Sequence, residues 1–224
     1  MKKYYIAPSL ITSNLLNIQQ DIQTLDKLGV DFYHYDIIDS TFGGRFGLPS
    51  VLIPQIMSMT ETPLDIHIMV QDPSRIIQGI LPYCRGNFIT LHAEVSKEIE
   101  TLLAIIRKEG GKAGVALNPG TSLHELDELI PWVDLILIMT ENAGYGYLQG
   151  FSETMLDKIQ RTAALIGDRE ILLEVDGNLH PDIIVKTYQS GANTFVMGSK
   201  SLFRPQYSLE QNYNDMVRLL EENS

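Results

Sequence analysis

The run FYHYDII at Phe32–Ile38 is short and rich in aromatic and β-branched residues, and a longer amphipathic segment follows it. Such a run is typical of a β-strand. Seven similar runs begin near Tyr4, Pro63, Phe88, Lys112, Leu135, Glu170 and Thr194. Their starts lie roughly 23–35 residues apart, the length of one strand plus a crossover helix. Eight such units predict an α/β fold, a closed (β/α)8 TIM barrel, with residues 1–224 as a single domain.

The competing fold is a doubly wound open sheet. That fold usually has about five to seven strands, and a glycine fingerprint often follows its first strand. Here Pro8-Ser9-Leu10 follows the first run and forms no such fingerprint. The pattern therefore favours the barrel.

The segments between the runs predict helices with one apolar face. In the first segment, Asn14 is the expected N-cap and Gly29 the expected C-terminal stop. Ser96 is expected to cap the helix of the fourth segment, and Ser152 precedes the apolar positions of the sixth. Pro54 interrupts the second segment, so we expect a short or late helix there.

Composition excludes several classes of protein. Lys and Arg number 17 against 28 Asp and Glu, a net charge of −11 that disfavours nucleic-acid or anionic-membrane binding. The single cysteine, Cys84, excludes an intramolecular disulfide and a thiolate-rich metal site. The sequence has neither a membrane-length apolar run nor a signal-peptide core. We therefore expect a soluble cytoplasmic protein.

Ionisable residues stand at the ends of several predicted strands, where barrel enzymes carry their reactive groups. Side chains two apart on a strand share a face, so His34 and Asp36 point the same way. His67 and Asp176 end the third and seventh runs. Nitrogen and oxygen donors without thiolate suit one divalent cation, either Zn²⁺, Fe²⁺, Mn²⁺ or Co²⁺. Any one of these histidines alone equally suits a hydrogen-bonded core position, but burying all four groups is costly unless they are paired or metal-bound.

Glycine-containing turns follow the last three strands. They are Ala143–Gly146, Gly177-Asn178 and Gly198-Ser199. Backbone N–H groups in such turns approach anions closely, and barrels often bind phosphate after strands seven and eight. Turns also need glycine for geometry alone, but three consecutive cases favour a phosphate site.

With these residues assembled, the chain resembles the ribulose-phosphate 3-epimerase family, including its hexulose-6-phosphate (allulose-6-phosphate) 3-epimerase relatives. The resemblance spans nearly the whole chain. The matching stretches are IAPSL at Ile6–Leu10, HYDIID at His34–Asp39, LDIHIMV at Leu64–Val70, ITLHAE at Ile89–Glu94, KAGVALNPGTSL at Lys112–Leu123, VDLILIMT at Val133–Thr140, EVDG at Glu174–Gly177 and GS at Gly198–Ser199.

The resemblance implies a (β/α)8 barrel and a role for each matching residue. The implied metal ligands are His34, Asp36, His67 and Asp176, with Asp36 and Asp176 as the two acid/base residues. Zinc is the expected occupant. The implied substrate-binding residues are Ser9, His67, Gly144, Tyr145, Gly146, Tyr147, Gly177, Asn178, Gly198 and Ser199, with Met69 and Met139 in support.

The expected reaction is inversion at carbon 3 of a ketose phosphate through a cis-enediolate, with one Asp on each face. Ribulose 5-phosphate and xylulose 5-phosphate, of the pentose phosphate pathway, are the first expected pair. Allulose 6-phosphate and fructose 6-phosphate are the alternative. A Schiff-base aldolase at Lys200 and a non-catalytic sugar-phosphate-binding barrel are the rivals of another class. The family also implies a homo-oligomer, a dimer or a hexamer.

Two loops depart from the family pattern. The segment after the second strand, Ser40–Arg45, carries the unusual charge of Arg45, and the segment Ala143–Gln149 follows the sixth strand. Asn178 stands where the family usually has a second glycine. These changes leave the proposed metal ligands in place and affect the loops expected to cover the sugar, so they bear on the substrate's identity.

Overall fold

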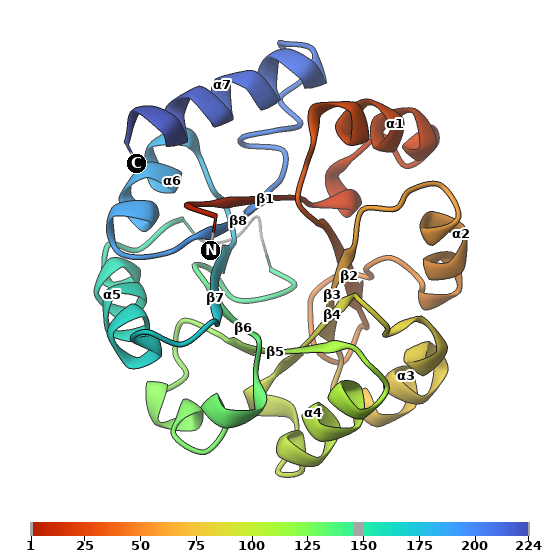
Figure 1. Cartoon of the computed structure of the whole chain (residues 1–224), viewed down its shortest axis with the longest axis vertical. Coiled ribbons are helices and arrows are strands. Elements are labelled where there is room, and N and C mark those ends of the chain that lie inside the picture. Colours follow the sequence, from red (N-terminus) through yellow and green to blue (C-terminus); the bar gives the residue numbers. More distant parts are fainter. Residues whose placement is uncertain (1, 146–149, 224) are drawn as a thin grey trace.

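The computed structural model describes residues 2–145 and 150–223, and these form a ring of eight parallel strands surrounded by helices (Figure 1). The strands are β1 (Tyr5–Pro8), β2 (Tyr33–Ile38), β3 (Leu64–Met69), β4 (Phe88–His92), β5 (Lys112–Leu117), β6 (Leu135–Met139), β7 (Leu172–Asp176) and β8 (Thr194–Met197). The α-helices are α1 (Ile18–Leu28), α2 (Ile53–Met57), α3 (Pro73–Ile80), α4 (Ile99–Lys108), α5 (Thr154–Ile166), α6 (Pro181–Gln189) and α7 (Leu209–Glu222).

The sheet closes on itself. Each strand pairs in parallel with the next from β2 to β8, and β8 pairs with β1. A parallel bridge between Ser9 and His34 joins the ends of β1 and β2 and completes the ring. The (β/α)8 TIM barrel expected from the sequence is therefore confirmed, and the open sheet is excluded.

Alternation along each strand separates two apolar layers. On β6, Leu135, Leu137 and Met139 pack inside the barrel, whereas Ile136 and Ile138 belong to the core between strands and helices. The same parity operates on β2, where Tyr33, Tyr35 and Ile37 face the helices and Ile38 faces inward. His34 and Asp36 share the parity of Ile38 and thus point into the barrel.

Two predicted helix caps were wrong, one by three residues and one by two. The N-cap of α1 is Asn17, not Asn14, because the apolar Leu15 and Leu16 lie in an exposed turn before the helix. The N-cap of helix α4 is Glu98 instead of Ser96, and helix α5 begins after Glu153, one residue beyond Ser152. The Ser96 hydroxyl instead accepts a hydrogen bond from the backbone N–H of Glu98, before the helix begins.

Other helix features follow the sequence. Gly29 ends α1 in the left-handed conformation, with φ 79°. Pro54 lies in the first turn of the five-residue helix α2, as expected for a short helix. The crossover from β5 to β6, all of whose residues are described, contains only the 3-10 helices Leu123–Leu126 and Ile130–Trp132. Within the described ranges, no helix combines the length and apolar character needed to cross a membrane.

Candidate metal and active site

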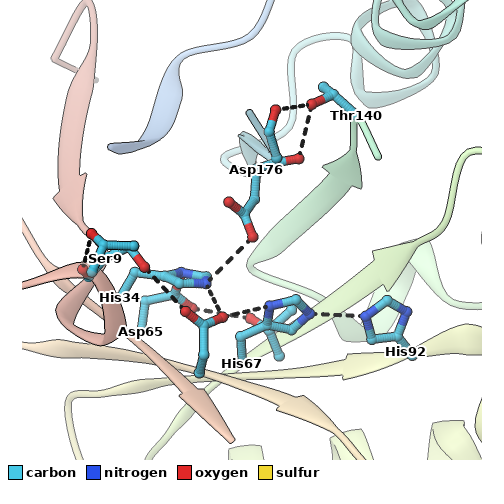
Figure 2. Close-up of polar contacts among 11 residues, drawn as sticks. Ser9, His34, Asp65, His67, His92, Thr140 and Asp176 are labelled. Atoms are coloured by element: carbon cyan, nitrogen blue, oxygen red, sulfur yellow. Dashed lines mark hydrogen bonds and ion pairs between the residues drawn. The ribbon is translucent and has the colours of Figure 1, made fainter. Parts of the chain in front are cut away.

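Four ionisable side chains meet inside the carboxyl-terminal end of the barrel. His34 and Asp36 come from β2, His67 from β3 and Asp176 from the end of β7 (Figure 2). One donor atom from each lies within 4.8 Å of the others. The sequence predicted this meeting from strand parity and position alone.

The contacts within the cluster centre on Asp36. Its Oδ1 lies 3.1 Å from His34 Nε2 and 3.5 Å from His67 Nδ1, and its Oδ2 accepts a hydrogen bond of 3.1 Å from the Ser9 hydroxyl. Asp176 Oδ2 lies 3.9 Å from His34 Nε2. Both histidines are fully buried, whereas the Asp176 side chain keeps 20% of its surface exposed to the mouth.

The donor set suits a divalent cation. Two imidazoles and two carboxylates, without thiolate, form a site typical of Zn²⁺, Fe²⁺, Mn²⁺ or Co²⁺. His67 Nδ1 is buried and has no hydrogen-bond partner among the described residues, although it faces the cluster. A buried imidazole nitrogen with nothing to bond is costly, and a metal ion facing it removes that cost.

A second set of buried groups lies behind His34. Asp65 Oδ2 contacts His34 Nδ1, and Asp65 Oδ1 accepts a hydrogen bond of 3.2 Å from Thr90 Oγ1. Glu174 is also close enough to share an ion with His34 and Asp65. Burial, with the negative charge of Asp65, raises the pKa of Glu174 well above its ordinary value. Sequence reasoning did not assign these roles, although Asp65 and Glu174 precede His67 and Asp176 by two positions and so share their inward face.

The two aspartates experience different electrostatic surroundings. Burial raises the pKa of Asp176 to about 6, and the charge of Asp36 adds to the effect. For Asp36, burial acts in the same direction, but the hydrogen-bonded His34 outweighs it and holds the pKa below its ordinary value. The paired carboxylates of Asp36 and Asp65 also outweigh burial at His34 and raise its pKa well above the ordinary value. In this arrangement Asp36 is ionised at neutral pH, and Asp176 takes up a proton more readily.

A cavity opens directly above the cluster. The residues named as substrate-binding or supporting from the sequence that line it are Ser9, Met69, Met139, Gly144, Gly177, Asn178, Gly198 and Ser199. Asp36 and Asp176 form part of its floor, and Lys200 also lines it. Tyr145 is 38% exposed, and Gly146 and Tyr147 lie outside the described residues. Gly177 has φ 113° and Asn178 has φ 50°, so this turn needs residues that tolerate positive φ.

The two loops that depart from the family pattern touch each other above the cavity. A Cβ atom on Gly144 would lie 2.7 Å from the Cα of Gly43, so these backbones pack without side chains between them. Arg45, on the same loop as Gly43, reaches the cavity wall. The sequence identified Arg45 as an unusual charge near the site, but it did not predict that the two loops are in contact.

Glu141, which sequence reasoning missed, lines the same cavity. Burial, with the nearby Asp176, raises its pKa to about 7. Its Oε2 has no hydrogen-bond partner within the described part of the chain. The only signal in the sequence was a carboxylate two residues after the predicted strand that ends at Met139.

The fold and this donor set define a (β/α)8-barrel enzyme with an ionisable cluster at the carboxyl ends of its strands. Residues 5–203 match the sequence profile of the Ribulose-phosphate 3 epimerase family. The chain is 34% identical over 202 residues to a ribulose-phosphate 3-epimerase of Buchnera aphidicola subsp. Acyrthosiphon pisum, covering 89% of this chain and 88% of that relative. It is 32% identical over 210 residues to the one of Serratia marcescens, covering 92% and 99%. The chain therefore belongs to the ribulose-phosphate 3-epimerase family, whose members are isomerases acting on carbohydrates.

Solved structures of other barrels support the fold. Phosphoribosyl anthranilate isomerase from Thermus thermophilus superposes with a TM-score of 0.67 at 11% identity, covering 98% of this chain and 100% of that one. A mutant tryptophan synthase α-subunit from Pyrococcus furiosus gives 0.66 at 15% identity, covering 99% and 97%. At these identities the likeness concerns the fold alone.

Proposed function

We propose that the chain is a metal-dependent ketose-phosphate 3-epimerase, acting first on ribulose 5-phosphate and xylulose 5-phosphate. The observation that carries the proposal is the convergence of Asp36 and Asp176. These carboxylates come from β2 and β7, which are not neighbours in the sheet, yet both reach the floor of one cavity. Inversion of a carbon centre through a planar intermediate needs one proton-transferring group on each face.

Each aspartate has one task in each direction. In one direction Asp36, as carboxylate, takes the proton from carbon 3, and Asp176, protonated, returns one to the opposite face. The tasks exchange in the reverse direction. Ser9 donates to Asp36 Oδ2, which directs the other oxygen toward the histidines. The Thr140 N–H donates to the backbone carbonyl of Asp176. The Thr140 hydroxyl donates to the same carbonyl and to that of Gly177, which fixes the end of β7 (Figure 2).

His34, Asp36, His67 and Asp176 would hold the divalent cation. A bound cation supplies positive charge that stabilises the oxygen anion formed when the carbon 3 proton leaves. Zinc is the cation that we propose for the native protein. Met69 and Met139 line the cavity and would exclude water from the reacting carbon.

The turns Gly177-Asn178 and Gly198-Ser199 would anchor the phosphate. Both line the cavity beside Asp176. Their backbone N–H groups need no positive side chain, which agrees with the acidic character of the chain. Gly144 also lines the cavity. We propose that Tyr145, Gly146 and Tyr147, which follow it in the sequence, bind the substrate as well. Anchoring the phosphate would hold carbon 3 between the two aspartates.

A six-carbon substrate is the second candidate. Arg45 and Glu141 line the cavity beside the proposed sugar site. Arg45 belongs to one of the loops that depart from the family pattern. Extra polar groups there suit a sugar with an additional hydroxyl, as in allulose 6-phosphate and fructose 6-phosphate.

The deciding experiment incubates zinc-loaded protein with each of the four ketose phosphates and reads the configuration at carbon 3 by NMR. Asp176→Asn is the control. We expect ribulose 5-phosphate and xylulose 5-phosphate to interconvert. Turnover of only the hexulose phosphates would move the assignment to the second candidate. Tight binding without inversion of any sugar would make the chain a sugar-phosphate-binding protein instead.

We also propose a homo-oligomer, a dimer or a hexamer, for the native protein. Light scattering behind size-exclusion chromatography measures the mass directly. A mass near 25.2 kDa, that of one chain, would contradict this proposal.

A further inference from the structure

The His67 ring has different partners on its two nitrogens. Nδ1 faces Asp36 Oδ1 at 3.5 Å and makes no hydrogen bond with the described residues. Nε2 lies 2.9 Å from Nε2 of His92, which ends β4 (Figure 2). Two imidazole nitrogens at this distance form a hydrogen bond only if one carries hydrogen and the other presents a lone pair. The donor is therefore either His67 Nε2 or His92 Nε2.

Glu94, which lies beyond His92, determines which of the two rings donates. Its Oε2 lies 2.9 Å from His92 Nδ1. Its Oε1 accepts hydrogen bonds from the backbone N–H of Asn118, at 2.7 Å, and from the hydroxyl of Thr121. The side-chain Nδ2 of Asn118 lies farther from His92 Nδ1, at 3.4 Å. The nearer carboxylate only accepts, so His92 Nδ1 carries the hydrogen. His92 Nε2 then presents its lone pair, and His67 Nε2 must donate to it.

We propose that His92 and Glu94 are positioning residues that fix His67 in its Nε2–H tautomer, with the lone pair of Nδ1 directed at the cation site. The inference rests on the metal site of the proposed function. His34 uses the opposite arrangement, because its Nδ1 contacts Asp65 and its Nε2 faces the cluster. The two imidazoles thus present different nitrogens to the same place, each held by a carboxylate at the far end.

The chain of contacts from His67 through His92 to Glu94, called the relay below, is closely packed. His92 is fully buried, and its ring lies 5.0 Å from the His67 ring at an interplanar angle of 24°. The Phe42 ring lies 4.7 Å from the His92 ring as well. Asn118 continues from the relay to the loop over the cavity, because its side-chain oxygen accepts a hydrogen bond of 2.9 Å from the backbone of Ala143. Burial and these ring contacts hold the His92 ring in one orientation, and its hydrogen-bond partners then select the tautomer.

Glu94→Gln is the variant that reverses the relay. The backbone N–H of Asn118 can only donate, so the glutamine keeps its oxygen toward Asn118 and turns its NH₂ toward His92 Nδ1. His92 must then accept there and donate from Nε2. His67 Nε2 in turn becomes an acceptor, and its hydrogen moves to Nδ1, which blocks the cation site. Thr121→Val is the matched control, because it removes a hydrogen bond to Oε1 of Glu94 and leaves the bond to His92.

The test has two readouts that are independent of turnover. Long-range ¹H–¹⁵N NMR of protein labelled at its five histidines assigns the tautomers, and chelator competition measures the Zn²⁺ dissociation constant. We expect hydrogen on Nε2 of His67 and on Nδ1 of His92 in the zinc-loaded protein. Glu94→Gln should weaken zinc binding about 10- to 100-fold, and Thr121→Val should leave it nearly unchanged.

Hydrogen on Nδ1 of His67 in zinc-loaded wild type would overturn the proposal, as would wild-type zinc affinity in a folded Glu94→Gln variant. The wild-type NMR measurement decides even if that variant does not fold. A protein with the expected tautomers and zinc affinities that inverts no ketose phosphate would leave this inference standing and refute the proposed reaction.

Discussion

Replacing Gly144 by alanine tests whether the two loops above the cavity are held together by direct backbone packing. Gly144 has φ 79°, a left-handed conformation that costs a residue with a Cβ about 1–2 kcal/mol. The new Cβ would also lie 2.7 Å from the Cα of Gly43, closer than real Cβ contacts. Because the obstacle is backbone, the two loops must separate or the strain must remain.

We expect Gly144→Ala to lose at least about 1–2 kcal/mol of unfolding free energy, a fall of about 2–8 °C in Tm for a chain of this size. If the two loops instead separate and relieve the strain, KM for the sugar phosphate should rise. The assay is thermal unfolding combined with steady-state kinetics. Gly120→Ala is the control, since its backbone lies outside the left-handed region and nothing lies within 4 Å of its Cβ. That variant should be neutral or gain about 0.4–1 kcal/mol. Wild-type Tm together with wild-type KM in Gly144→Ala would show that direct backbone packing does not hold the two loops together.

Three further predictions concern the groups around the site. The pKa of Glu94 is held at about 2, because the donors His92, Thr121 and Asn118 outweigh burial, which acts to raise it. The ionised Glu94 therefore contributes about 3 kcal/mol to the unfolding free energy above pH 4.5, and this contribution is lost as the pH falls toward 2. Urea unfolding at pH 6 and at pH 3.5 should show that acidification lowers the unfolding free energy less in Glu94→Gln than in wild type. An equal fall in the two proteins would contradict this. The Lys158 ammonium donates to the carbonyls of Asn118, Pro119 and Thr121, so Lys158→Met should cost about 1–3 kcal/mol in urea unfolding, and wild-type stability would argue against that role. Removing the divalent cation with a chelator should lower both Tm and activity. Zinc at 100 times its dissociation constant should restore about 2.7 kcal/mol of unfolding free energy. Zinc that adds no stability would count against a metal site in the native state.

Strand parity explains why the centre of the site was predictable. His34 and Asp36 lie two apart on a strand whose alternate positions face the helices, so their common direction follows from the sequence. The position of Asp176 at the end of its strand follows from the same alternation. In a closed parallel sheet, all such ends meet at one mouth. The meeting of these residues therefore needs no knowledge of side-chain contacts.

The helix starts were less predictable because capping residues are common and local. Asn14 has the right chemistry for an N-cap, but Leu15 and Leu16 are exposed and do not belong to the apolar face. Only the packing of the first turn decides between Asn14 and Asn17. Ser96 likewise bonds the backbone of Glu98 in a turn that precedes the helix.

The groups behind and above the site could not be assigned from the sequence. The contact of Asp65 with His34 depends on the register between β2 and β3, which places them side by side. The packing of Gly43 on Gly144 joins two loops far apart in the chain, and no local pattern reports such a contact. The position of Glu141 in the cavity wall depends on the absent side chain of Gly177 beside it.

The roles of Asp36 and Asp176 are tested by following the carbon 3 proton of ribulose 5-phosphate by NMR, with zinc-loaded protein in deuterated solvent. We expect exchange accompanied by inversion in the wild type, and loss of inversion in both Asp36→Asn and Asp176→Asn, because each variant lacks the proton-transferring group of one face. Inversion at the wild-type rate in either variant would contradict the two-aspartate mechanism, because the reaction would then proceed without one of the two carboxylates at the floor of the cavity.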